Sequence, residues 1–415
     1  MIYVDTNKEP ITYEALLVVQ LRADGEPFLP RLESFKCCIA TEALIPFIPI
    51  FLSPQTVKID VEFPKRSPAV AVASIIIMFP KLCPNLESIA INHPFKDSAI
   101  IDAASEMLLA CNRDSLKILN VKCPLTEEAR EVVYQLPKLS DLWTVIKGHT
   151  LLPPVALPNL TKILVRFDHL DWLQGLRGAA LEKLESAIFQ YDESKQIGDF
   201  LGELERVSLM ASAQNTLSEF IFHTPGSWNP NYSFLLSFKQ LRRLEIVGAC
   251  DGGCSSRVDD DVIKALAQAM PKLEILRLGS APCGAPAGAT VHGLIALASR
   301  CLHLSELRIH FQGNSLADAV TSVTARPLFY GEPVAPREEC ALTVLEVGSI
   351  PLPLQSAEGV TVLLLQIFPR ITKVDTMTPE WRIVAQGIWN FRKIATFVRR
   401  TGKASMILND LVGRY

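Results

Sequence analysis

The sequence has little net charge, a modest aromatic content and no long apolar run. Its 41 Lys and Arg residues nearly balance its 44 Asp and Glu residues, which leaves a formal charge of -3. General binders of nucleic acid or of membrane surfaces need a basic excess, so we expect neither kind of partner. The longest apolar run, residues 69–79, is about half as long as the roughly 20 residues of a membrane-spanning helix. This run predicts a buried helix instead.

Signals for secretion and for a disulfide framework are missing as well. The first residues show no basic stretch followed by an apolar one, as a secretory signal would. Ten cysteines in 415 residues are too few for a disulfide-stapled domain. We therefore expect reduced thiols and a cytoplasmic or nuclear location.

Motifs for nucleotide, metal or hydrolytic chemistry do not occur. The stretch Thr401-Gly402-Lys403-Ala404 lacks both the upstream glycine and the following Ser or Thr of a phosphate-binding loop. The most metal-like segment is Cys250-Asp251-Gly252-Gly253-Cys254, with Cys283 and His303 among the residues downstream, but the second pair is not closely spaced as in a zinc site. We predict no catalytic residue, no metal site and no cofactor. A metal enzyme or hydrolase built on these loops is the least favoured alternative.

One short phrase returns thirteen times along the chain: an apolar residue, two variable residues, an apolar residue, one variable residue and an apolar residue. The mean spacing of the copies is near 28 residues, which lies within the range of leucine-rich repeats. We call the first residue of each copy its anchor. The anchors are Leu32, Thr56, Leu86, Leu116, Leu139, Leu160, Leu184, Leu217, Leu241, Leu273, Leu304, Leu342 and Ile371.

The residues between successive copies have a helical pattern. Residues 259–270 open with acidic residues, which suit a helix N-terminus, and continue with apolar residues at i, i+3 and i+4 spacing. Residues 126–133 begin in the same way. A proline two places before an anchor ends the helix there, because proline cannot continue it. Six copies have this proline: Pro30, Pro84, Pro137, Pro158, Pro271 and Pro369.

These features predict an α/β fold, a leucine-rich repeat solenoid or horseshoe with a parallel sheet on its concave side and helices on its convex side. The alternative is an ordinary doubly wound α/β domain, although no Gly-rich phosphate turn follows any predicted strand. We assign residues 1–28 to an N-terminal cap, residues 29–376 to about 13 repeats with a long loop at 312–339, and residues 377–415 to a helical C-terminal cap. The basic excess of this last segment is either a docking tail or the solvated face of a helix.

Four cysteines, Cys83, Cys111, Cys301 and Cys340, lie two to five residues before an anchor. A small, polarisable side chain fits the junction between a helix and the next strand. We predict that these four thiols belong to the core.

The phrase also predicts which side chains line the concave side. Because strand side chains alternate between the two faces, the residue between the last two apolar positions points away from the core. Trp143, Leu164, Ile188 and Ile221 occupy this position in the middle repeats, and we expect a contiguous apolar stripe there, followed by a polar rim. A register shift near Leu139, or a segment that covers the stripe, would remove it. The predicted partner-binding residues are Trp143, Leu164, Ile188, Ile221, Glu245, Arg277 and Arg308.

Several short segments form a recognisable combination. They include Leu82-Cys83-Pro84-Asn85-Leu86, Leu157-Pro158-Asn159-Leu160, Trp228-Asn229-Pro230-Asn231-Tyr232 and Met270-Pro271-Lys272-Leu273-Glu274. Through these segments, residues 28–375 resemble the leucine-rich repeat region of fungal F-box proteins, especially basidiomycete ones. In such proteins an F-box binds the Skp-type adaptor of a Skp–cullin ubiquitin ligase, and the repeats capture the substrate. Residues 1–28 contain no F-box-like opening, so a Skp-type adaptor is expected only if an F-box lies upstream.

The resulting hypothesis is a non-enzymatic protein that binds a protein partner on its concave face, as an F-box-type substrate receptor or its remnant. The alternative is a free-standing repeat scaffold with no role in ubiquitin transfer.

Overall fold

The computed structural model describes most of the chain. The described residues are 2–5, 17–18, 27–39, 41–92, 97–148, 156–177, 179–192, 200–206, 212–225, 232–248, 258–279, 288–323, 340–348, 350–376 and 378–401. They form two compact units: residues 1–192 with 202–217, and residues 193–201 with 218–415.

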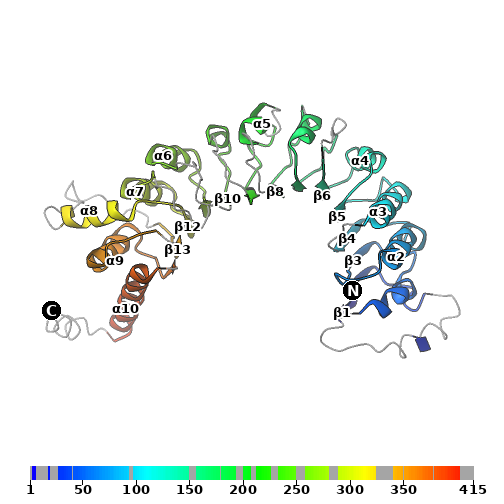
Figure 1. Cartoon of the computed structure of the whole chain (residues 1–415), viewed down its shortest axis with the longest axis horizontal. Coiled ribbons are helices and arrows are strands. Elements are labelled where there is room, and N and C mark those ends of the chain that lie inside the picture. The colour runs from blue at the N-terminus through cyan, green and yellow to red at the C-terminus, as the bar shows by residue number, and fades with distance from the viewer. Residues whose placement is uncertain are drawn as a thin grey trace. The chain divides into compact units, whose positions relative to one another are not determined.

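The first unit is a run of parallel strands in which each strand pairs with the next one along the chain. Figure 1 shows the helices α2, α3 and α4 on one side of these strands. The strands are β1 (Ile2–Asp5), β2 (Ser34–Cys38), β3 (Lys58–Glu62), β4 (Ser88–Asn92), β5 (Ile118–Pro124), β6 (Asp141–Ile146), β7 (Lys162–Phe167) and β8 (Ser186–Tyr191). The helices are η1 (Glu42–Phe51), α2 (Ala69–Leu82), α3 (Ser98–Ala110), α4 (Glu127–Val133) and η2 (Asp171–Leu176).

The second unit repeats this arrangement, again with consecutive strands paired in parallel. Its strands are β9 (Glu219–Thr224), β10 (Arg243–Gly248), β11 (Ile275–Leu278), β12 (Glu306–Arg308), β13 (Val344–Gly348) and β14 (Lys373–Thr376). Its helices are η3 (Ser233–Ser237), α6 (Asp260–Ala269), α7 (Val291–Arg300), α8 (Gly313–Val323), η4 (Leu354–Ser356), α9 (Ala357–Ile367) and α10 (Pro379–Thr401). The short helix α5 covers Phe200–Arg206.

The strands begin where the repeated phrase predicts them. In every one of the thirteen copies the strand starts two residues after the anchor. The apolar positions of the phrase form the core; in one copy Leu273, Leu276 and Leu278 are at most 1% exposed. Both units therefore have the leucine-rich repeat solenoid fold, with one parallel strand per repeat, and the doubly wound alternative is wrong.

The helices and their ends also follow the sequence. The apolar run forms α2, and the two acidic starts form α4 and α6, which are capped by the side chains of Thr126 and Asp259. The proline rule is confirmed as well: α6 ends at Ala269, just before the turn at Pro271. The predicted C-terminal helix is α10.

Hydroxyl groups just before several strands join one repeat to the previous one. The Thr343 hydroxyl donates to the carbonyl of Ser305 at 3.1 Å, and the Ser305 hydroxyl donates to the carbonyl of Glu274 at 2.9 Å. The same contact recurs in the first unit, where Thr161 donates to Ser140 and Ser140 donates to Lys117. Each of these carbonyls also accepts backbone N–H groups of the following repeat, so the hydroxyl groups add to the bonds between successive repeats.

Two features of the predicted domain organisation differ from the structure. Residues 1–28, assigned to a cap, contain β1, which pairs in parallel with β2 and extends the sheet before the first anchor. The predicted loop at 312–339 is wrong in its first part, because residues 313–323 form α8. The prolines that suggested a loop come later, in residues 324–339, which lie outside the described part. None of the described helices is long and apolar enough to cross a membrane.

Candidate recognition surface

In each unit, the face of the strands opposite the helices carries three rows of side chains. We call it the open face. The middle row is the position between the last two apolar residues of the phrase, the leading row lies two residues before it, and the trailing row lies two residues after it. Where the strand register is regular, side chains in one row stand opposite each other on neighbouring strands, about 4.8 Å apart. The following contacts are given for each unit by itself.

Three residues of the predicted stripe are aligned in the first unit. Trp143 on β6 stands opposite Leu164 on β7, and Leu164 stands opposite Ile188 on β8. All three side chains are half-buried, so each presents part of its apolar surface on the open face. The register from β6 to β8 is regular, and the only shift recorded beside β6 comes after the pair of Asn120 and Trp143. The register shift that would have dispersed the stripe is therefore absent at these three positions.

Trp143 has an unusual local environment. The ammonium group of Lys122, on β5, lies 4.2 Å from the centroid of the indole ring, which is a cation–π contact. The indole Nε1 is buried and has no hydrogen-bond partner, and neither has Oδ1 of Asn120 on the neighbouring strand. A buried polar atom without a hydrogen-bond partner lowers the stability of the fold. The region around Trp143 therefore carries such a cost at both atoms.

The prediction that Ile221 extends the exposed stripe is wrong, because this side chain is only 6% exposed. It stands opposite Glu245 of β10, and Glu219 precedes it by two residues on the same face of β9. Arg243 links these two carboxylates, since its Nη1 lies 3.4 Å from Glu219 and its Nη2 lies 2.7 Å from Glu245. The ion-paired side chains flank Ile221 and leave little of it accessible. Ile221 thus belongs to a charged surface in the second unit.

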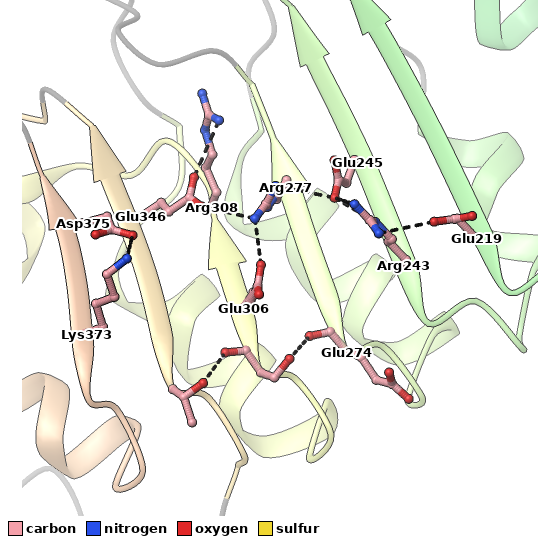
Figure 2. A network of polar contacts seen from close by, with 12 residues as sticks. Glu219, Arg243, Glu245, Glu274, Arg277, Glu306, Arg308, Glu346, Lys373 and Asp375 are labelled. Atoms are coloured by element: carbon pink, nitrogen blue, oxygen red, sulfur yellow. Dashed lines mark hydrogen bonds and ion pairs between the residues drawn. The ribbon is translucent and has the colours of Figure 1, made fainter. Parts of the chain in front are cut away.

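Figure 2 shows that charged side chains continue across the open face of β9–β14. We call this set the charge ladder; its members are Glu219, Arg243, Glu245, Arg277, Glu306, Arg308, Glu346, Lys373 and Asp375. Arg277, at its centre, contacts three carboxylates, with distances of 3.6 Å to Glu245, 2.7 Å to Glu306 and 3.3 Å to Glu346. Arg308 lies 3.6 Å from Glu346. The middle-row residues Glu245, Arg277, Arg308 and Glu346 are in register on consecutive strands, as predicted.

Glu245 is the most buried member of the charge ladder, with 3% of the residue exposed. Burial raises the pKa of its carboxyl, but hydrogen bonds from His223 and Arg243 and the charge of Arg277 outweigh this effect, and the pKa lies below its ordinary value. Glu245 is therefore ionised at neutral pH. It holds Arg243 and Arg277 in place more than it faces solvent, which differs from the predicted polar rim.

Several residues of the surface escaped the sequence reasoning. Lys122 follows Asn120 by two residues on β5, and Glu219, Arg243 and Glu306 belong to leading rows. Only the middle row was read from the phrase. The period of two along a strand would have found the others, because residues two places apart share a face.

The four cysteines that precede an anchor have buried thiols. Cys83, Cys111, Cys301 and Cys340 are free and buried, as predicted. Burial raises the pKa of Cys111 and of Cys301 to about 12, which keeps both as unreactive thiols at neutral pH. The described residues contain no group of three His, Cys, Asp or Glu side chains that could hold a metal ion. Cys250, Cys254 and Cys283 lie outside the described part of the chain.

No protein-family model matches the chain, and no curated protein matches it either. Among solved structures, the chain is similar to one in the crystal structure of a Rad7 and Elc1 complex in yeast. The sequence identity is 14%, the match covers 68% of this chain and 77% of that chain, and the TM-score is 0.38. A likeness of this strength supports no argument about function. The fold assignment rests on the strand register and the buried repeat positions.

Proposed function

We propose that this chain is a non-enzymatic recognition module that binds a protein partner on the open face of its sheets. The supporting observation is the row of Trp143, Leu164 and Ile188, where an aromatic and two aliphatic side chains reach the surface side by side. An aromatic anchor among aliphatic residues and cations has the composition of a binding hot spot. The charge ladder of the second unit offers a polar surface whose charges are held in fixed positions by one another.

The more specific proposal is that the chain acts as an F-box-type substrate receptor of a Skp–cullin ubiquitin ligase, or is the remnant of one. Its support is the resemblance of residues 28–375 to the repeats of fungal F-box proteins. Co-purification of the full-length natural protein tests this proposal. Recovery of a Skp-type adaptor is expected. Recovery of another stable partner without the adaptor would favour the free-standing repeat scaffold instead.

The role of the open face is tested with substitutions that keep the fold. Trp143→Asp together with Ile188→Asp should abolish capture of the partner, because each places a charge within the apolar contact. Val70→Asp is the matched control, since Val70 lies on α2 of the same unit and is already 73% exposed. Unchanged capture by the double variant, with a circular dichroism spectrum like that of the parent, would refute recognition through this face.

A further inference from the structure

The open face of the first unit has an uneven charge distribution. On β2–β4 the cations Lys36 and Lys58 are matched by the carboxylates Asp60 and Glu62, and Lys36 pairs with Asp60 at 2.8 Å. On β5–β8 the strand residues of the open face include one carboxylate, Asp141, and three cations. These cations are Lys122, Lys162 and Arg166. The positive excess thus coincides with the strands that carry the stripe.

Two of these cations are available to a partner. Arg166 is paired with Asp192, which also lies 3.9 Å from Lys147. Lys122 and Lys162 are exposed and make no ion pair with any described residue. The ammonium group of Lys122 lies over the ring of Trp143. A carboxylate of a partner could take the place of this ring as the contact of the ammonium group.

The two free lysines lie on opposite sides of the stripe. Lys122 comes two residues after Asn120 on β5, where the register with β6 shifts, whereas Lys162 is in the leading row, two residues before Leu164. The stripe itself crosses three strands, or roughly 10 Å, which is the length of about three residues of extended chain. Because this surface has an apolar centre with a cation on either side, a complementary partner has apolar side chains flanked by carboxylates.

We propose that the stripe of Trp143, Leu164 and Ile188 binds a short acidic segment of a partner protein, in which two apolar side chains are flanked by Asp or Glu. This inference rests on the proposed recognition function and specifies its partner. The apolar side chains cover the stripe, and the carboxylates pair with Lys122 and Lys162. When Lys122 leaves the ring, the indole face becomes part of the contact.

A random dodecapeptide phage library panned against the full chain tests this assignment without a known ligand. We expect enrichment of peptides with two apolar residues and flanking acidic residues. Fluorescence anisotropy with a labelled enriched peptide then measures affinity. Raising the NaCl concentration from about 0.05 M to about 0.5 M should weaken binding, because the Debye length falls to a few ångströms.

Point variants locate the peptide on the surface. Trp143→Ser should weaken binding by about 30-fold or more, as the loss of a hot-spot anchor does. Lys122→Gln and Lys162→Gln should each weaken binding about two- to fivefold, the usual size of an exposed charge contact. Lys58→Gln is the matched control, because this exposed lysine lies on the open face of β3, away from the stripe, and we expect less than a twofold change. Circular dichroism of each variant checks the fold.

Each other outcome has a defined meaning. Enrichment of basic or uncharged peptides that still require Trp143 would overturn the acidic assignment and leave recognition through the open face intact. Enrichment that Trp143→Ser does not affect would place binding elsewhere and overturn this inference. Self-association of the chain that Trp143→Ser abolishes would identify a second copy as the occupant and would also overturn it. A lack of any enriched peptide would overturn the proposed segment, while partner capture by the natural protein would still decide the recognition function separately.

Discussion

Asp260 joins two successive repeats of the second unit through one carboxylate. Asp260 begins α6, yet its Oδ1 accepts hydrogen bonds from the backbone N–H groups of Thr290, at 2.8 Å, and Gly293, at 3.0 Å. Its Oδ2 accepts the hydroxyl proton of Thr290 at 2.6 Å. These donors lie at the N-terminus of α7, where backbone N–H groups have no partner within the helix and where a negative charge is favourable.

The size of the effect follows from these contacts. Asp260→Ala removes the acceptor of two N–H groups and of one hydroxyl group. A hydrogen bond to a charged group contributes roughly 1.5–3 kcal/mol, but this site is half-buried and water can replace part of the loss. We expect Asp260→Ala to lower the free energy of unfolding by about 2–3 kcal/mol. Asp260→Asn keeps one acceptor oxygen and loses the charge, so its cost should be about 1 kcal/mol.

Urea unfolding combined with hydrogen exchange measures this prediction. Solenoid repeats can open locally, so the protection of the α7 amides is read by mass spectrometry beside the global transition. Asp261→Ala is the control, since the adjacent Asp261 side chain is 94% exposed and its nearest cation, Lys264, is 3.7 Å away. Its cost should stay below about 0.5 kcal/mol.

The reasoning would be refuted if Asp260→Ala and Asp261→Ala had the same effect. Equal protection of the α7 amides in the parent and in Asp260→Ala would refute it too, because the carboxylate would then not support the neighbouring repeat.

Three further predictions concern the same fold. Because the pKa of Glu245 is lowered on folding, its contribution to stability is present above its unfolded pKa of about 4.3 and is lost as the pH falls through the folded pKa. The stability difference between the parent and Glu245→Gln, measured by urea unfolding, should thus be largest above about pH 5 and shrink in more acidic solution. Gly387→Ala would place a Cβ 2.8 Å from Cγ2 of the buried Thr361. We therefore expect the free energy of unfolding to fall by about 1–2 kcal/mol and the melting temperature to drop. An unchanged melting temperature would contradict the tight packing of α10 on α9. Cys301 should react with iodoacetamide at pH 8 only after unfolding, as peptide mass spectrometry can detect, and alkylation in the native protein would contradict its burial.

The fold was largely predictable from the repeated phrase. Each anchor is followed by a strand because apolar residues at fixed intervals can be buried only if successive units stack. The sequence prediction did not include the helix α8, because the predicted loop was defined by prolines that lie only after residue 323. The strand β1 was missed because a single four-residue segment has no period of its own, and it is defined only by its pairing with β2.

The candidate surface was predictable in part. The alternation of side chains along a strand placed Trp143, Leu164 and Ile188 in one row, and the register of β6–β8 agrees. The same rule could not give the burial of Glu245 or Ile221. Their exposure depends on where the long side chain of Arg243 lies, and a strand pattern carries no information about side-chain contacts across neighbouring strands.

The sequence by itself determined the number, position and direction of most strands, because the apolar phrase recurs along the chain and each copy is buried by stacking on the next one. It also determined that the thiols at helix ends, such as that of Cys301, are buried in the core. Only the tertiary structure decided which charges neutralise one another and which remain available. Arg277 is held by three carboxylates from three different strands, whereas Lys122 contacts an aromatic ring and, among the described residues, pairs with no carboxylate. These contacts join residues 21 to 69 positions apart in the sequence, and their energy depends on distances that exist only after the repeats have stacked.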